Sequence, residues 1–305
     1  MIEDFNDIDA LASQRKPMGL VALAADEEEF LRTVKQACER GYIQPCIIGD
    51  SEKLRRRADH IEFDLSNVAI IEEKEPQAIA DKGIDMLFSQ DAYIPMKGHI
   101  PTAYVYRAII RKERSIGGKD TISVNTLWDI PGVSHLVSIT DTGVSIHPDY
   151  ETKRRIINDA VDLMHILGYN RPKVAVLSAY NGFTDVLDSF IEAKRLQDEA
   201  QRGSFGECDL IPETSLTDIL AGTRGAFFEF DPAALEKTPH VLVVPHLDAG
   251  NILSKLDFIL DVTRRSLVMT SKGPVIIPSR SDTHKVIVGE VALGVVVARL
   301  LWGTN

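Results

Sequence analysis

VLVVPHLDAGN at residues 241–251 and PVIIPSRSDTH at residues 274–284 decide the fold of this 305-residue chain. Each stretch begins with a short apolar run rich in β-branched residues and ends abruptly in small, polar and charged residues. Runs of this length and composition predict buried parallel strands. Ligands of open α/β folds bind just beyond the carboxyl ends of such strands, so these two polar ends are the first candidates for a functional site.

The N-terminal half of the chain alternates predicted strands with predicted helices. Strands are expected at 19–25, 45–49 and 68–72, and helices at 27–40, 52–60 and 75–90. This alternation predicts a parallel sheet with helices on both faces, an α/β fold. The short runs 121–126, 136–140 and 145–147 predict an antiparallel or edge addition to a sheet.

The second half returns to the same rhythm after residue 148, where we expect the main domain change. Helices are predicted over 150–167, 185–201, 216–221 and 249–260, and strands over 173–178 and 241–245. The apolar stretch 286–302 is interrupted by Gly289, Glu290, Gly294 and Arg299. It therefore predicts a buried C-terminal helix rather than a membrane span.

The composition is that of a soluble globular protein, with 44% hydrophobic and 26% charged residues. A formal net charge of -11 argues against nucleic acid or an anionic membrane as the main partner. A small anionic ligand needs only a local cationic pocket and stays compatible with that charge. The three cysteines show no metal-ligand spacing, and the acidic N-terminus resembles no signal peptide, so we expect reduced thiols and a cytoplasmic location.

Ser279-Arg280-Ser281-Asp282 follows one predicted strand and precedes the last helix. A hydroxyl, a guanidinium and helix N-terminal amides make a suitable oxyanion or phosphate pocket. The alternative is that Ser and Asp cap the helix while Arg280 is a surface charge. Gly250 and Asn251 follow the other strand, where they could approach a ligand or belong to an ordinary capped turn.

Lys97-Gly98-His99 ends a further apolar run, and Arg107 lies one to two turns into the next predicted helix. Lys97 and Arg107 could face one anion. A capping or surface role is the more common one for His99, and a solvated helix face is the alternative for Arg107. The sequence has no GxGxxG after its first strand and no Walker A, HExxH or GxSxG motif, so no cofactor fingerprint is present.

Together these stretches resemble the phosphate acetyltransferase/phosphate butyryltransferase family, with features of the butyryl branch. The resemblance runs from about residue 15 to the C-terminus, and no single motif decides it. The segments that carry it are Met96–His99 with Thr102, Ala103 and Arg107; Thr140-Asp141 with Ile146–Asp149; Ala160–Leu163 with Leu167-Gly168; Pro172–Ser178; Leu242–Asn251 with Lys255; and Pro278–Arg280 with Asp282.

The resemblance implies two three-layer α/β domains with a cleft between them, an architecture like that of isocitrate and isopropylmalate dehydrogenases. Residues 1–147 with a returning segment 270–305 would form the first domain, and residues 148–269 the second. It also implies a homodimer and reversible acyl transfer between coenzyme A and inorganic phosphate. Coenzyme A would be a substrate, no metal or other cofactor would be needed, and an acyl kinase could use the acyl phosphate.

The family also implies roles for single residues. Ser279, Arg280 and Arg107 would bind the phosphate, with Ser279 and Arg280 at the reacting centre. Lys97 is added to this set on the pattern of the residues alone. The base of the acetyl branch is a carboxylate at the position of Val286, so Asp282 is our substitute as base or base-positioner, with His284 as second choice. Coenzyme A would contact the residues Asn251, Gly250, Lys255 and His99.

Two other functions stay open at this point. A decarboxylating 2-hydroxyacid dehydrogenase has a similar fold, but it needs an Asp cluster for a divalent metal, which the sequence does not suggest. A non-catalytic acyl-CoA or acyl phosphate binding protein is the second alternative, because Val286 replaces a carboxylate.

Overall fold

A computed structural model describes residues 1–89, 93–180, 185–221 and 237–303 of the chain. The chain divides into two compact units, which we treat separately. The N/C unit comprises Phe5–Ile122 and Arg265–Asn305, and the middle unit comprises Met1–Asp4 and Ser123–Arg264. The C-terminal segment thus belongs with the N-terminal half, while the units divide at 122/123 and 264/265 instead of the expected 147/148 and 269/270.

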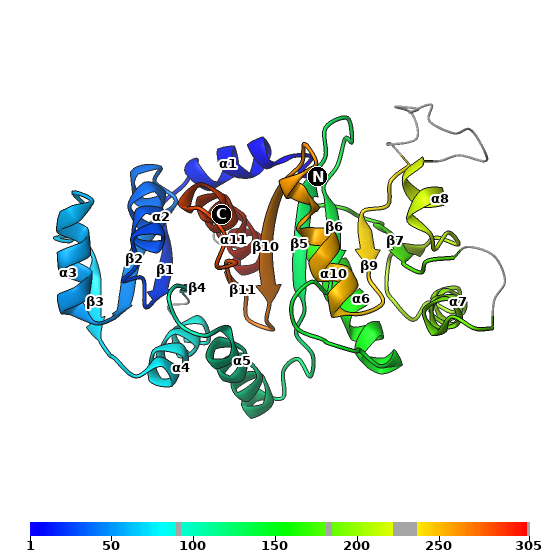
Figure 1. The fold of residues 1–305 in the computed structure, drawn as a ribbon, viewed down its shortest axis with the longest axis horizontal. Coiled ribbons are helices and arrows are strands. Elements are labelled where there is room, and N and C mark those ends of the chain that lie inside the picture. The colour runs from blue at the N-terminus through cyan, green and yellow to red at the C-terminus, as the bar shows by residue number, and fades with distance from the viewer. Residues whose placement is uncertain (90–92, 181–184, 222–236, 304–305) are drawn as a thin grey trace. The chain divides into compact units, whose positions relative to one another are not determined.

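The N/C unit is built on four parallel strands in the order β3-β2-β1-β4 (Figure 1). The strands are β1 (Met18–Leu23), β2 (Ile43–Gly49), β3 (Ala69–Glu72) and β4 (Ile94–Lys97). The helices between and after them are α2 (Glu28–Glu39), α3 (Ser51–His60), α4 (Pro76–Leu87) and α5 (Thr102–Ile116). The α/β class and the parallel sheet predicted from the sequence are confirmed.

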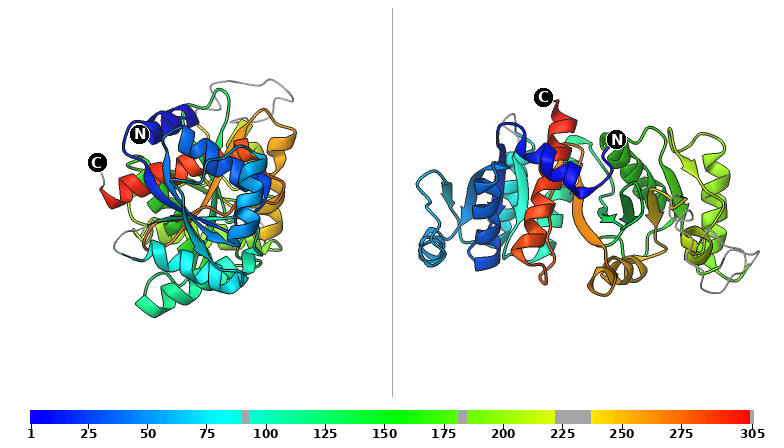
Figure 2. Two further views of the ribbon diagram at one scale, coloured as in Figure 1. Left: turned by 90° about the vertical axis from the view of Figure 1, so that its left-hand side faces the viewer. Right: turned by 90° about the horizontal axis from the view of Figure 1, so that it is seen from above.

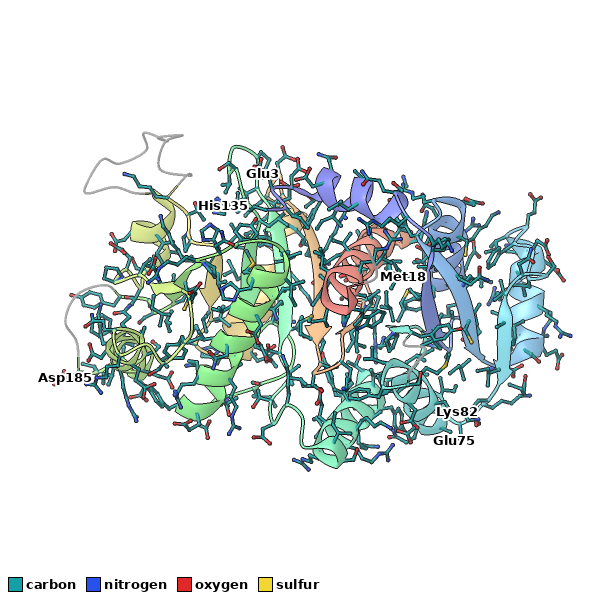
Figure 3. The ribbon with its side chains drawn as sticks, turned by 180° about the vertical axis from the view of Figure 1, so that it is seen from behind. Glu3, Met18, Glu75, Lys82, His135 and Asp185 are labelled. Atoms are coloured by element: carbon teal, nitrogen blue, oxygen red, sulfur yellow. The ribbon has the colours of Figure 1, made fainter. Side chains whose placement is uncertain are left out.

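The strand order places helices on both faces of this sheet. Since parallel crossovers are right-handed, α2 and α3, which lead outward from β1, lie on one face, and α4, which leads back to β4, lies on the other. Helix α4 packs against α5. Glu75, labelled in Figure 3, caps α4 by accepting a hydrogen bond from the Ala78 amide at 2.6 Å.

The strand register places the carboxyl ends of β1, β2 and β4 at the same level of the sheet. Leu23 is the partner of Ile48 on one side and of Lys97 on the other. A residue that follows β1 therefore lies beside one that follows β4. This edge of the sheet carries the candidate site.

Helix α11 (His284–Trp302) is buried on almost every side, as predicted. It packs against α2 and against α1 (Phe5–Ser13), and Figure 2 shows these helices from two further directions. Arg299 is only 5% exposed. Its guanidinium donates hydrogen bonds to the carbonyl oxygens of Leu11 at 2.7 Å and Lys16 at 2.8 Å, which ties α1 and the following loop to α11.

The C-terminal strands differ from the expectation. Strand β11 (Pro274–Val275) pairs antiparallel with β10 (Thr263–Met269), so the predicted parallel pairing of Val275 is wrong. The next residue, Ile276, does form a parallel bridge with Met96 of β4. That bridge places the Ser279 loop next to the end of β4.

The described residues of the middle unit include five strands in the order β5-β6-β9-β7-β8. The pair β5–β6 is antiparallel, as predicted, and the other pairs are parallel. The strands are β5 (Val124–Asp129), β6 (Val137–Thr140), β7 (Lys173–Val176), β8 (Asp209–Leu210) and β9 (Val241–Val243). The helices are α6 (Tyr150–Ile166), α7 (Asp188–Ala200), α8 (Leu216–Ala221), α10 (Leu247–Ser254) and the 3-10 turn Leu256–Phe258.

The predicted strand at 145–147 does not form. The buried Asp141 carboxylate accepts hydrogen bonds from the amides of Gly143, Val144 and Ser145 and so holds this segment as a loop. A carboxylate that satisfies successive amides competes with a strand ladder. Among the described residues, we find no helix whose length and apolarity would let it cross a membrane.

Candidate active site

The site is built where β1 and β4 of the N/C unit end. The amides of Gly98 and His99 each donate a 2.8 Å hydrogen bond, to the carbonyl oxygens of Leu23 and Ala24 respectively. A Cβ at Gly98 would lie 2.5 Å from the Ala24 oxygen, so only glycine fits this position. The two strand ends are therefore locked together, and the flanking Lys97 and His99 are held in place.

Lys97 is the buried cation of this edge, with an exposure of 3%. Its ammonium donates a hydrogen bond to the Gly98 carbonyl at 3.1 Å and lies 5.9 Å from the centre of the Phe30 ring. Burial lowers the pKa of Lys97, the Arg280 guanidinium lowers it further, and the Glu27 carboxylate opposes both effects. The Arg280 guanidinium therefore lies close enough to the Lys97 ammonium to repel it.

A tight turn carries Ser279 and Arg280. The Ser279 amide donates to the Asp282 carboxylate at 2.8 Å, and the Asp282 amide donates to the Ser279 carbonyl at 3.1 Å. Asp282 is only 8% exposed, whereas Arg280 projects to the surface. The geometry thus shows Asp282 as a residue that holds the turn and presents Ser279 and Arg280.

The sequence missed the contribution of α2. The N-cap of α2 is Glu27, which makes no side-chain capping bond. The Glu27 carboxylate contacts His99 Nε2 at 3.0 Å, and Glu29 contacts His284 Nδ1 at 3.1 Å. No sequence motif links these partners, because the fold brings them together.

Arg107 lies on α5, and its contacts are not with the other residues predicted to bind phosphate. Its guanidinium donates to Gln77 of α4 at 2.9 Å and lies 5.3 Å from the Tyr104 ring centre. Within the described part of the chain, no contact joins Arg107 to Ser279, Arg280 or Lys97. Its phosphate role stays a prediction.

The residues predicted to contact coenzyme A fall in both units. His99 belongs to the N/C unit, and Gly250, Asn251 and Lys255 belong to the middle unit. Gly250 approaches its own chain, since a Cβ there would lie 2.5 Å from the Asp141 oxygen. The Asn251 amide donates to the Thr142 carbonyl at 3.4 Å. Gly250 and Asn251 therefore fix α10 onto the loop after β6, and Lys255 lies exposed at the end of α10.

A concave site that no sequence motif indicates lies wholly in the middle unit. It is a cavity of about 460 Å³ beyond the carboxyl ends of β6 and β9. The Arg195 guanidinium lies 3.7 Å from the centre of the Tyr150 ring, and the buried Lys153 is paired with Glu192. This volume falls in the range of small-molecule and nucleotide pockets.

The family described as Phosphate acetyl/butaryl transferase matches residues 80–295, which is more than half of the chain. The matched segment contains Lys97, Gly98, His99, Ser279 and Arg280. The family assignment thus covers most of the site that the geometry defines.

Individual relatives agree with this match. The chain is 26% identical to a phosphate butyryltransferase of Clostridium acetobutylicum, covering 98% of this chain and 99% of the relative. It is 28% identical to a phosphate acetyltransferase of Rhizobium meliloti, covering 95% and 92% respectively.

A solved structure confirms the fold. A branched-chain phosphotransacylase from Enterococcus faecalis V583 is similar with a TM-score of 0.75 at 21% identity, covering 92% of this chain and 99% of that one. The family match over most of the chain, which includes the strand-end site, identifies the protein as a member of the phosphate acetyl/butaryl transferase family of phosphate acyltransferases.

Proposed function

We propose that this chain catalyses the reversible reaction of a short-chain acyl-CoA with inorganic phosphate to give an acyl phosphate and free coenzyme A, and that the edge of the sheet beside Ser279 binds the phosphate. The observation that carries the proposal is that two cations, Lys97 and Arg280, lie near each other. Neither forms an ion pair with a described residue. Because Lys97 is buried, its charged form costs free energy unless an anion lies beside it. A phosphate would neutralise both.

The chemistry that these groups can supply is positioning and charge stabilisation. In one direction a phosphate oxygen attacks the thioester carbonyl and the thiolate leaves. In the other direction the thiolate attacks the acyl phosphate, and phosphate departs with its charge held by Arg280 and Lys97. Ser279 supplies a hydroxyl for the reacting oxygen, and the turn closed by Asp282 fixes its place. Arg107 would join the phosphate site if its guanidinium left Gln77.

Residues of the middle unit would bind coenzyme A, and His99 stays a predicted contact within the N/C unit. Lys255 and Asn251 are both exposed and available to a ligand. The stacked Tyr150 and Arg195 offer a planar, cationic surface to a nucleotide base. We propose an acyl chain of the butyryl class, supported by the segments Met96–His99 and Ser279–Asp282 and by the likeness to a phosphate butyryltransferase.

We also propose a cytoplasmic homodimer that supplies acyl phosphate to an acyl kinase. The cytoplasmic location is supported by the free thiols of Cys38, Cys46 and Cys208. The dimer and the kinase follow from the family resemblance. A molar mass measured by light scattering tests the dimer.

The decisive experiment for the site compares Arg280→Ala with Arg56→Ala. Arg56 is a surface residue of α3 whose pair with Glu52 is 3.7 Å long and exposed. We expect Arg280→Ala to lower phosphate-dependent thiol release by about 100-fold or more, since one transition-state charge partner is worth about that much. Arg56→Ala should match the wild type. Equal rates for both variants would refute the phosphate site, and coenzyme A binding without turnover in the wild type would favour a binding protein.

A further inference from the structure

We propose that Glu29 and His284 form the proton-transferring pair of this active site, with His284 as the base that accepts the coenzyme A thiol proton and Glu29 as the residue that positions its ring. The inference rests on the proposed acyl transfer and deepens it. The base expected from the acetyl branch is a carboxylate, but this chain has Val286 at that position. The inference assigns the role of base to His284 instead.

Glu29 holds His284 at two points. One carboxylate oxygen, Oε2, accepts the backbone amide of His284 at 2.6 Å and lies 3.1 Å from its ring Nδ1. A carboxylate beside Nδ1 keeps the proton on that nitrogen, which leaves Nε2 as a hydrogen-bond acceptor. The amide hydrogen bond lowers the pKa of Glu29, so the carboxylate is charged at neutral pH.

His284 is better placed for proton transfer than its neighbours. It lies five residues after Ser279, at the first turn of α11, and its side chain is 29% exposed. Asp282 is nearly buried and already accepts the Ser279 amide. His99 is 65% exposed, and its Nε2 is the nitrogen that contacts Glu27. Among the described residues, His284 thus combines a fixed ring, an Nε2 without a hydrogen-bond partner and a position next to the Ser279–Asp282 turn.

In the direction of thioester formation, the thiol proton moves to His284 Nε2, and the sulfur forms a bond to the acyl carbon. The bond from that carbon to the phosphate oxygen breaks, and phosphate leaves with its electron pair toward Arg280 and Lys97. In the reverse direction the imidazolium returns the proton to the departing thiolate. Glu29 stabilises the imidazolium in both directions.

The test measures acyl-CoA formation from butyryl phosphate and coenzyme A over pH 5.5 to 9. We expect His284→Gln to lower kcat by about 100-fold or more, the usual contribution of a general base. The KM for butyryl phosphate should change by less than about 3-fold, because Arg280 and Lys97 remain. The wild-type rate should rise with pH over this range, and the variant should lose that rise. Added imidazole should restore part of its rate.

Arg32 on α2 acts electrostatically on Glu29, Asp282 lies two residues before His284, and Lys285 follows it directly. These groups are unchanged in His284→Gln, so a lost pH dependence reports on His284. Glu29→Gln provides a second variant, which keeps an acceptor for the amide but lacks the charge. We expect it to lower kcat by at least about 10-fold.

The matched controls are Glu28→Gln and His60→Gln. Glu28 on α2 and His60 on α3 form a Glu–His contact of 3.9 Å outside the site. Both controls should keep the wild-type rate and pH profile. An unchanged pH profile in His284→Gln, or a loss that imidazole cannot restore, would overturn the proposal. A wild type without phosphate-dependent turnover would instead refute the acyl transfer itself.

Discussion

Gly98→Ala tests whether the locked ends of β1 and β4 organise the site. A Cβ at this position would lie 2.5 Å from the Ala24 oxygen and 2.7 Å from the Leu23 oxygen, and both atoms are backbone. Ordinary contacts begin near 3.4 Å, so β4 must retreat from β1 by about 0.9 Å. Overpacking of this kind costs about 1–3 kcal/mol of folding free energy. A displacement of about 1 Å at reacting groups costs about 100-fold in rate.

The assay combines urea unfolding with phosphate-dependent thiol release. Gly49→Ala is the matched control, because its Cβ would meet the same neighbour, Ala24, at an ordinary 3.5 Å. We expect Gly98→Ala to lose both stability and rate while Gly49→Ala keeps the rate. If the two variants behave alike in both measurements, the close approach does not position Lys97 and His99, and the reasoning fails.

Two further predictions concern the stability of each unit. Arg299→Met should destabilise the N/C unit by about 3–5 kcal/mol in urea unfolding, because it leaves buried carbonyl groups of the α1 region without a donor. A loss below about 1 kcal/mol would contradict the role of Arg299. Burial lowers the pKa of His240 from 6.5 to about 4, and the nearby His135 and Lys173 contribute to this shift. The folded state therefore resists its protonation, and stability should fall by about 2 kcal/mol as pH drops from 6.5 to 4. His240→Asn, which keeps an acceptor for the Lys173 amide, should show a smaller fall, and an equal fall would refute the assignment.

The apolar runs made most strands predictable. Strands β1, β2 and β9 are short, apolar and rich in β-branched residues, so their burial could be predicted without knowledge of their partners. Strand β10 escaped prediction because Arg264 and Arg265 look like surface charges. The structure gives them partners within their own units: Arg264 pairs with Asp257 at 2.7 Å, and Arg265 pairs with Asp9 at 2.8 Å.

The candidate site was predictable where its residues follow a strand. Lys97 and the Ser279–Asp282 turn could be identified because strand ends of one sheet share an edge. The partners Glu27 and Glu29 could not, since an acidic first turn is also what the helix dipole favours. Gly250 was predicted beside a ligand, but it packs against the Asp141 carbonyl of its own chain. The sequence indicates that another group comes close to the backbone at such a glycine, but it does not indicate which group.

The most direct test of the acyl transfer is thiol release from acetyl-, propionyl-, butyryl- and isobutyryl-CoA, each measured with and without phosphate. The account predicts that release requires phosphate and is fastest with a four-carbon chain. Thiol release at the same rate with and without phosphate would contradict it. So would the absence of thiol release from all four substrates by a protein that still binds coenzyme A.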